Sequence, residues 1–336
     1  MVSLPRPRGA TSEFLLGHLP EPLHRLPSFD LPACAEPLED DDLQLSLYLC
    51  YELHYRGLPG VGEDWEWEPS LLDLRRRLER TFEDALERTV PRPPAAGAAA
   101  AMDLALRALL DADESPSLAR YVQRRATADE VRELVVHRSA YQLKEADPHS
   151  WVVPRLAGRP KAAIVEIQAD EYGGGHAERI HAELFAREMR ALGLDSRYGA
   201  YLDCLPGTTL ATVNVMSLFG LHRRWRGAVV GHLAVGEMSS AVPNRRYGDG
   251  LRRLGFGADA TEFHDEHVTA DAVHESIAGV DMAGGLALQD PALVSDILWG
   301  AAAMLELEGR FARRLLGAWE AGTSSLLSPL PSPAAA

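Results

Sequence analysis

Residues 262–275 read Glu-Phe-His-Asp-Glu-His-Val-Thr-Ala-Asp-Ala-Val-His-Glu. If this stretch is a helix, His267, Asp271 and His274 stand at positions i, i+4 and i+7, along one stripe of its surface. A helix that packs into a domain normally presents apolar residues there. Burying two imidazoles and a carboxylate costs free energy unless they are paired or bind a metal. The stripe therefore predicts either a metal-binding helix face or a solvent-exposed polar face.

The donor atoms of this stripe are nitrogen and oxygen. Such a mixed set suits iron or manganese better than structural zinc, which usually takes thiolates. His264 lies one turn earlier near the same stripe and is a further candidate ligand, or a support for one.

Composition limits the class of protein. The 336 residues are 46% apolar and 25% charged, which is typical of a soluble globular chain, and the net charge of −15 argues against nucleic-acid or anionic-membrane binding. Cys34, Cys50 and Cys204 are far apart, so neither a disulfide framework nor a zinc ribbon is expected. We found no signal peptide and no run of 18 apolar residues, and we expect a cytoplasmic protein.

The apolar residues recur mostly with the helical period, and no alternating run predicts a strand. The expected fold class is therefore all-α. Helices are expected at residues 43–55, 70–87, 104–112, 117–125, 130–142, 161–171, 177–192, 208–221, 228–238, 251–254, 262–278 and 292–316.

Other regions are expected to lie outside helices. The proline-rich residues 1–36 predict an extended arm, and residues 243–250 interrupt the helical pattern. The Pro/Ala/Gly-rich segment 91–101 predicts a boundary between an N-terminal arm and helical extension, residues 1–100, and a domain of residues 101–323. The tail, residues 324–336, is expected to be disordered.

Four residues outside the first stretch are candidates to complete a metal site. Glu171 and His181 flank the glycines at 173–175, and a turn there would bring both side chains to one place. Glu237 ends an apolar run, where a carboxylate requires a partner. Glu145 follows a long amphipathic helix, and the sequence alone scarcely separates it from Asp147 or Glu166 as a candidate. Each of these residues could instead be an exposed polar residue or a histidine hydrogen-bonded in the core. The glycines themselves predict a plain turn rather than a phosphate-binding loop.

A competing pattern is Glu178-x-x-His181. Ferritin-like di-iron bundles use two Glu-x-x-His units and two further glutamates. Here the second unit would have to be Asp271-x-x-His274, which does not match that pattern.

His267-x3-Asp271-x2-His274, with Glu237 thirty residues upstream, resembles the last-helix signature of the haem-oxygenase-like di-iron oxidases and oxygenases. Residues 142–149, Gln-Leu-Lys-Glu-Ala-Asp-Pro-His, and 170–175, Asp-Glu-Tyr-Gly-Gly-Gly, resemble motifs of their bacterial "iron-containing redox enzyme" relatives. The resemblance covers about residues 115–315.

The resemblance implies a haem-oxygenase-like helical bundle and a set of ligands. Six core ligands are implied: Glu145, His181, Glu237, His267, Asp271 and His274. The resemblance also implies Glu171 as an extra, oxygen-responsive carboxylate. Four carboxylates would neutralise two divalent ions, so burial becomes tolerable. His176 is expected to lie at the surface or to support a ligand.

The implied function is that of a non-haem di-iron oxidase or oxygenase, with two Fe ions (or Mn/Fe) as cofactor and O2 as co-substrate. N-oxygenation, desaturation and C–C cleavage of a small organic molecule all remain open, with a slight preference for an amine. The expected partners are that substrate and an external electron donor, without nucleic acid or membrane, and a homodimer is compatible with the sequence. Thr208–Leu221 and Ala228–Met238 are expected to line the substrate pocket.

Two rival functions use the same chain differently. A haem-binding or haem-degrading protein would need a proximal histidine, for which His137 is the nearest candidate. A non-catalytic helical scaffold or metal-binding protein would use residues 37–90 as its partner surface.

Overall fold

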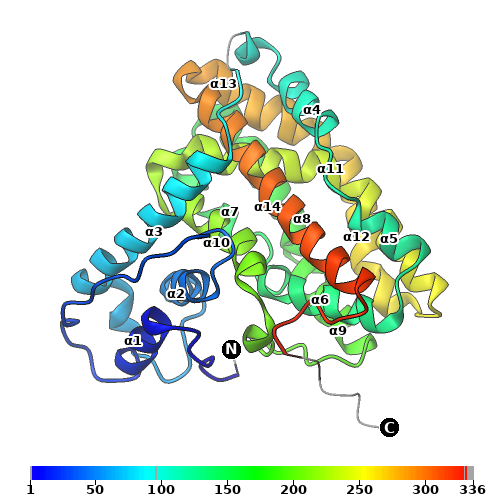
Figure 1. Cartoon of the computed structure of the whole chain (residues 1–336). Coiled ribbons are helices and arrows are strands. Elements are labelled where there is room, and N and C mark those ends of the chain that lie inside the picture. Colours follow the sequence, from blue (N-terminus) through cyan, green and yellow to red (C-terminus); the bar gives the residue numbers. More distant parts are fainter. Residues whose placement is uncertain (1, 95–96, 329, 331–336) are drawn as a thin grey trace.

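The computed structural model describes residues 2–94, 97–328 and 330, without the side chains of residues 271 and 272 (Figure 1). Within these residues the structure is built from helices and has no strand, which confirms the all-α prediction. The α-helices are α1 (Ala10–His18), α2 (Asp41–Glu52), α3 (Pro69–Thr89), α4 (Met102–Asp111), α5 (Leu118–Arg124), α6 (Ala128–Gln142), α7 (Asp147–Ser150), α8 (Gly158–Glu171), α9 (His181–Ala191), α10 (Gly207–Leu221), α11 (Arg226–Arg253), α12 (Ala258–Ser276), α13 (Gly285–Gln289) and α14 (Val294–Glu320). A π-helical segment, Ile277–Gly284, joins α12 to α13.

Helix α11 is the centre of the bundle. It packs along α12 and α14 and also contacts α5, while α9 packs on α12 and α10 packs on α2 (Figure 1). The first turns of α11, residues 227–235, are buried throughout. A helix that is apolar all round belongs in the core, so this sequence fixes its central position.

Two glycines allow α11 and α14 to approach closely. A Cβ atom on Gly231 would lie 1.8 Å from the carbonyl oxygen of Ile297, and one on Gly300 would lie 2.0 Å from that of Ala228. Only glycine fits at these two positions because the backbones themselves are in contact. The register between the two helices is therefore set by the sequence.

Helix α11 continues through the break that was expected at residues 243–250. Pro243 lies inside the helix. Proline has no backbone N–H to donate, so one hydrogen bond of the helix is absent there, yet the helix continues. The prediction was wrong because α11 as a whole packs on both α12 and α14, and tertiary packing outweighs local propensity.

Helix α1 lies in the predicted extended arm. Leu15 of this helix is fully buried. The Asp42 carboxylate accepts hydrogen bonds from the backbone N–H groups of Thr11 and Ser12 at 2.9 and 2.8 Å. A carboxylate at the first turn of a helix satisfies amides that have no partner within the helix. The cap comes from α2, so the local sequence did not reveal it.

The N-terminal helices share a core with the rest of the chain. Leu45 and Leu49 of α2 and Phe219 of α10 belong to one buried cluster. Lys144 forms an ion pair with Glu52 of α2, and their side chains are 1% and 0% exposed. The Tyr198 hydroxyl donates to the second Glu52 oxygen at 2.7 Å. The predicted boundary at residues 91–101 therefore separates segments that are packed together.

The first part of the predicted disordered tail is packed. Ser325 is buried, and its hydroxyl donates to Glu133 at 2.7 Å. His137 lies 3.0 Å from the same hydroxyl. The structure differs from the predicted disorder at Ser325, because Glu133 and His137 of α6 form hydrogen bonds with this residue. Residues 329 and 331–336 lie outside the described residues. In the part of the chain that is described, no helix combines the length and the apolar character needed to cross a membrane.

Candidate metal centre

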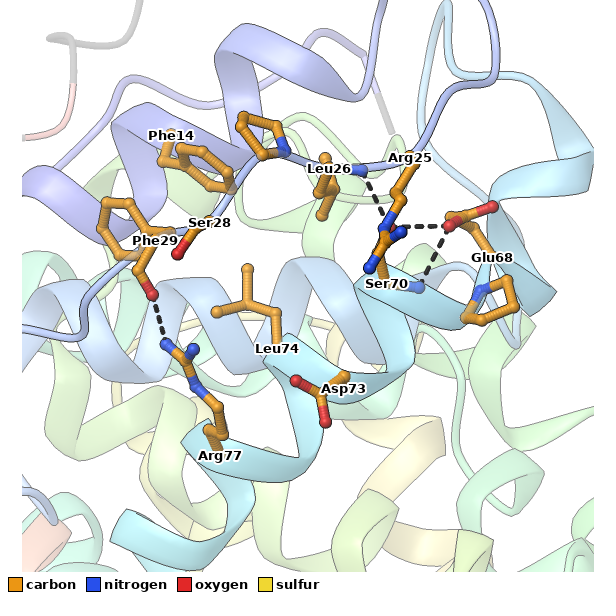
Figure 2. Close-up of a pocket in the computed structure, with 12 residues that line it drawn as sticks. Phe14, Arg25, Leu26, Ser28, Phe29, Glu68, Ser70, Asp73, Leu74 and Arg77 are labelled. Carbon is orange, nitrogen blue, oxygen red and sulfur yellow. Dashed lines mark hydrogen bonds between the residues drawn. The ribbon is translucent and has the colours of Figure 1, made fainter.

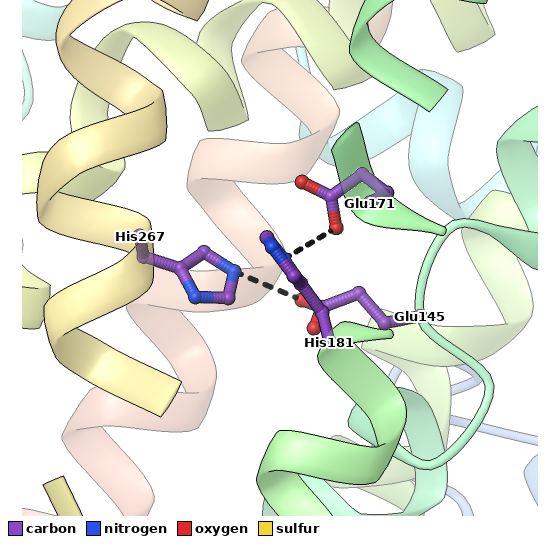
Figure 3. Close-up of side chains that lie close together, drawn as sticks. All are labelled: Glu145, Glu171, His181 and His267. Atoms are coloured by element: carbon purple, nitrogen blue, oxygen red, sulfur yellow. Dashed lines mark ion pairs between the residues drawn. The ribbon is translucent and has the colours of Figure 1, made fainter. Parts of the chain in front are cut away.

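The structure brings six of the seven predicted ligands into two overlapping groups. Within each group, one donor atom from every residue lies within 4.8 Å of the others. The first group comes from the segment after α6, from α8, α9 and α12 (Figure 3). The second comes from α8, α11 and α12. The first group is Glu145, Glu171, His181 and His267, and the second is Glu171, Glu237 and His274.

Glu171 and His181 meet across the glycine turn, as the sequence predicted. The Oε2 atom of Glu171 lies 2.9 Å from Nδ1 of His181. Gly173 has a φ of +70°, and a Cβ atom there would lie 2.7 Å from the backbone of Arg179 and Ile180. The turn requires glycine at this position because the chain doubles back on itself.

Glu145 is positioned by an unusual backbone conformation. Ala146, which follows it, has a φ of 72°, and its carbonyl oxygen accepts a hydrogen bond from Gln168 Nε2 at 2.9 Å. The Oε1 atom of Glu145 lies 3.7 Å from Nε2 of His267. Its Oε2 atom is buried and has no hydrogen-bond partner within the described residues. A buried carboxylate oxygen without a donor is typical of a position that a cation fills.

His267 presents a defined nitrogen to the first group. Its Nδ1 atom lies 2.8 Å from the carbonyl oxygen of Phe263, one turn earlier in α12. A carbonyl can only accept, so Nδ1 carries the proton and Nε2 of the neutral ring carries the lone pair. Backbone carbonyls commonly orient metal-binding histidines in this way.

His274 is held between two carboxylates. Its Nδ1 atom lies 3.1 Å from Glu237 Oε2, and its Nε2 atom lies 3.0 Å from Asp170 Oδ2. Burial lowers the pKa of His274, but the hydrogen bonds to Glu237 and Asp170 outweigh it and raise this pKa to about 9. Burial also raises the pKa of Glu237. Without metal, His274 is therefore protonated and hydrogen-bonded to Glu237 and Asp170.

Asp170 is a residue of the site that the sequence did not single out. It precedes Glu171 in α8, and its contact with His274 spans 104 positions of the chain. Asp271 was predicted as a ligand, but its side chain lies outside the described residues. It remains a predicted ligand.

The other candidate histidines are engaged elsewhere. His264 contacts Asn244 at 2.8 Å and Glu188 at 3.3 Å and belongs to neither ligand group. His176 is exposed, as was expected for a surface residue, and Glu178 beside it is 72% exposed. The Glu178-x-x-His181 unit therefore cannot act as a ferritin-like pair, because Glu178 faces solvent.

His137 does not suit a haem ligand. Its two ring nitrogens lie 2.7 Å from Thr209 Oγ1 and 3.0 Å from Ser325 Oγ. With both nitrogens engaged by hydroxyl groups, the ring has no position left for iron.

A cavity of about 860 Å³ adjoins both ligand groups. Its wall includes Glu145, Glu171, Glu237 and His267. As expected, α10 and α11 contribute to it. The apolar part of the wall is Leu110, Met216, Leu233, Met238, Val242, Pro243, Phe263, Met304 and Leu305. A cavity of this size and polarity is suited to a small organic molecule.

A second cavity, of about 950 Å³, lies in the N-terminal region between the segment of Phe29 and helix α3 (Figure 2). Its wall contains Phe14, Arg25 and Arg77 but none of the candidate ligands. Ser70 and Arg77 on its wall are engaged with neighbouring residues, including the Ser70–Glu68 and Ser70–Leu26 hydrogen bonds. This cavity is larger, but it is not adjacent to the clustered histidines and carboxylates.

The sequence profile of the iron-containing redox enzymes matches residues 132–309, which is more than half of the chain. The matched region contains all seven predicted ligands. No curated protein matches the chain.

Proposed function

The chain belongs to the iron-containing redox enzyme family, and from this we propose that it is a non-haem di-iron oxidase or oxygenase that uses O2 to oxidise a small organic substrate. The observation that carries this proposal is the position of Glu171, which is common to both ligand groups. A carboxylate has two oxygens and can therefore bridge two cations.

The donor set fits two iron ions. The first group offers two imidazoles and two carboxylates, and the second adds one imidazole and one carboxylate to Glu171. Mixed nitrogen and oxygen ligands suit iron and manganese, so a Mn/Fe pair would use the same residues. With Asp271 as the fourth carboxylate, the negative charge balances two divalent ions, which makes burial of the site tolerable.

The protein's own part in the reaction is to hold ligands, protons and substrate. Bound iron would supply the electrons that reduce O2, and an external donor would restore them. His267 offers a lone pair because Phe263 keeps its proton on Nδ1. His274 has to lose a proton before it can bind metal, so loading the second group releases that proton. The apolar side chains in the cavity wall limit the access of water to the ligands.

The reaction outcome follows from the substrate that the cavity admits. N-oxygenation, desaturation and C–C cleavage all use the same ligand set, and the resemblance to N-oxygenating relatives slightly favours an amine. We keep all three as outcomes of one oxidising centre.

An anaerobic Fe(II) titration of the chelator-treated chain tests the proposal. We expect the wild type to bind about two ions per chain. Glu237→Ala should lose one tight site, because Glu237 belongs only to the second group. Glu171→Ala should weaken both sites. Bound iron is counted by competition with a chromogenic chelator, and O2 consumption is then followed with an oxygen electrode.

Glu178→Ala is the matched control, because Glu178 neighbours the site in sequence but is 72% exposed. It should bind iron as the wild type does. If Glu171→Ala and Glu237→Ala lower iron binding equally, a shared carboxylate is contradicted. Iron binding without O2 consumption would favour a non-catalytic metal-binding protein, and a Soret band with added haem would favour the haem alternative. Elemental analysis of the isolated protein distinguishes Fe/Fe from Mn/Fe.

A further inference from the structure

A second pair of histidines lines the same cavity, apart from the candidate ligands. His149 comes from α7 and His232 from α11, and their Nε2 and Nδ1 atoms lie 3.2 Å apart. Both residues are buried, at 3% and 7% exposed. Neither belongs to the two ligand groups, and the function proposed above gives them no role.

This histidine pair is uncharged at neutral pH. Burial lowers the pKa of His232 to about 4 and that of His149 well below its ordinary value. Within the described residues, neither ring is hydrogen-bonded to a carboxylate that would favour its charged form. The contact between the rings is therefore a hydrogen bond in which one neutral imidazole donates to the other.

Two residues that line this cavity each carry a buried polar atom with no hydrogen-bond partner within the described residues: Nδ1 of His149 and Oε1 of Gln168. The Gln168 amide is fixed, because its Nε2 donates to the Ala146 carbonyl at 2.9 Å and to the Ser150 hydroxyl at 2.7 Å. Ser150 adjoins His149 in α7. Gln168 also lines the cavity. Buried polar atoms are nearly always paired, so these two atoms favour a polar group of a ligand beside them.

Helix α11 gives the cavity two different ends. His232 and Arg246 both line the cavity, and their separation in sequence corresponds to about 21 Å along a helix. Glu237 lies between them. Val242, near Arg246, is 56% exposed, whereas the helix around His232 is buried. The pair is therefore at the inner end, and the cavity opens to solvent beyond Glu237.

Among the described residues that line the cavity, no arginine is placed to receive an anion at the inner end. Of the arginines that line the cavity, Arg138 is held by both oxygens of Glu308 at 2.8 and 2.7 Å. Arg107 is paired with Glu275, and Arg246 lies at the open end. An ionised carboxylate or phosphate buried at the inner end would lack a counter-charge, which is costly.

We propose that His149, His232 and Gln168 form a binding subsite for an uncharged hydrogen-bond donor of the substrate, either a hydroxyl or an amide N–H group. The Gln168 oxygen accepts the ligand's proton, and the free nitrogen of His149 completes the contact. A substrate anchored there extends past Glu237, so its interior carbons or nitrogens, rather than this terminal group, lie beside the candidate metal ligands. This inference rests on the proposed function, because it takes the cavity to be the substrate site.

Head-group selectivity tests the subsite without knowledge of the substrate. The probes are hexanamide, 1-hexanol, hexanoate and hexylammonium, which share a chain and differ in the terminal group. Binding to the full chain, loaded with Zn(II) so that O2 does not react, is measured by ligand-observed NMR titration. We expect hexanamide and hexanol to bind at least about tenfold more tightly than hexanoate, as the loss of a buried hydrogen-bond partner predicts.

Variants identify the residues responsible. His149→Phe keeps the ring volume, removes the polar atoms and should weaken hexanamide by about tenfold. The double variant His149→Phe/His232→Leu removes both imidazoles, so no buried ring nitrogen is left without a partner and the fold should be kept. This variant should lose the preference for hexanamide altogether. Met304→Leu, elsewhere in the cavity wall, is the matched control and should keep the preference. Zinc content is checked for each variant.

Equal binding of hexanamide and hexanoate to the wild type would overturn the proposal. So would an unchanged preference in the double variant, or tighter binding of hexylammonium than of hexanamide. The same titrations on the metal-free chain separate this inference from the proposed function. If metal does not bind but the head-group preference persists, the di-iron proposal fails and the subsite stands. If metal binds and the preference is absent, the reverse holds.

Discussion

Ala146 is the one described non-glycine residue with a positive φ, and it lies directly after Glu145. A φ of 72° with a ψ of −31° is strained for a residue with a Cβ atom. Ala146→Gly should therefore stabilise the protein by about 1 kcal/mol, which corresponds to a rise in Tm of about 2 °C. Thermal unfolding of the metal-free chain measures this.

Ala146→Val is the matched opposite change. A β-branched side chain at this φ should lower the Tm and disturb the position of Glu145, and hence iron binding. If the glycine variant is less stable than the wild type, Ala146 is not strained.

Some of the candidate ligands could be predicted because their spacing is local, whereas Glu145 and Glu237 were assigned as ligands through the family resemblance. His267 and His274 share a helix stripe, and a glycine turn joins Glu171 to His181. The roles of Asp170 and of the His149–His232 pair could not be predicted in this way. Asp170 meets His274 over 104 positions, and the two histidines meet over 83. Such contacts depend on how the helices pack, which residue spacing along one segment does not encode.

The close approach of helices α11 and α14 at Gly231 can be tested by a substitution. Gly231→Ala would drive a Cβ atom to 1.8 Å from the Ile297 carbonyl oxygen. Because backbone rather than a flexible side chain must move, we expect a loss of about 3 kcal/mol in the free energy of unfolding. Urea unfolding followed by circular dichroism provides the measurement.

Gly317→Ala in α14 is the control. A Cβ atom on Gly317 would meet nothing within 4 Å, so the better helix propensity of alanine should stabilise the protein by up to about 1 kcal/mol. Equal destabilisation by both substitutions would show that helix contact at Gly231 is not the cause.

Helix positions followed from the sequence where apolar periodicity was strong, as in α3, expected at residues 70–87 and found at Pro69–Thr89. The prediction failed where proline dominated it. Pro243 did not end α11, because the packing of the whole helix on α12 and α14 outweighs the local propensity. In the N-terminal arm the prolines flank α1 rather than interrupt it, and its cap comes from Asp42, thirty-one positions away from Thr11.

At the scale of the whole molecule, His137 links α6, α10 and the C-terminal segment through Thr209 and Ser325. Burial lowers its pKa to about 3, whereas an unfolded histidine titrates near about 6.5. The unfolded chain therefore binds a proton at His137 that the folded chain does not bind. As a result, the free energy of unfolding falls as the pH drops below about 6.5. Between that pH and pH 5 the loss from this residue is on the order of 2 kcal/mol.

His137→Gln keeps hydrogen-bonding groups but cannot take up the proton. Its free energy of unfolding should fall less than that of the wild type between pH 7 and pH 5, as urea titrations at the two pH values would show. His149 and His232 add to the acid sensitivity of both proteins. An identical fall in wild type and variant would mean that His137 is not neutral in the folded chain.

The family-matched residues 132–309 include Lys144 but not Glu52, its buried partner in α2. A fragment that starts at residue 132 would lose α2, and with it both the ion-pair partner of Lys144 and the tyrosine ring of Tyr48 on which its ammonium packs. Lys144 adjoins Glu145 in the chain, so the loss would reach the segment that carries a candidate iron ligand. A shortened chain that is to keep these ligands in place should therefore retain α2.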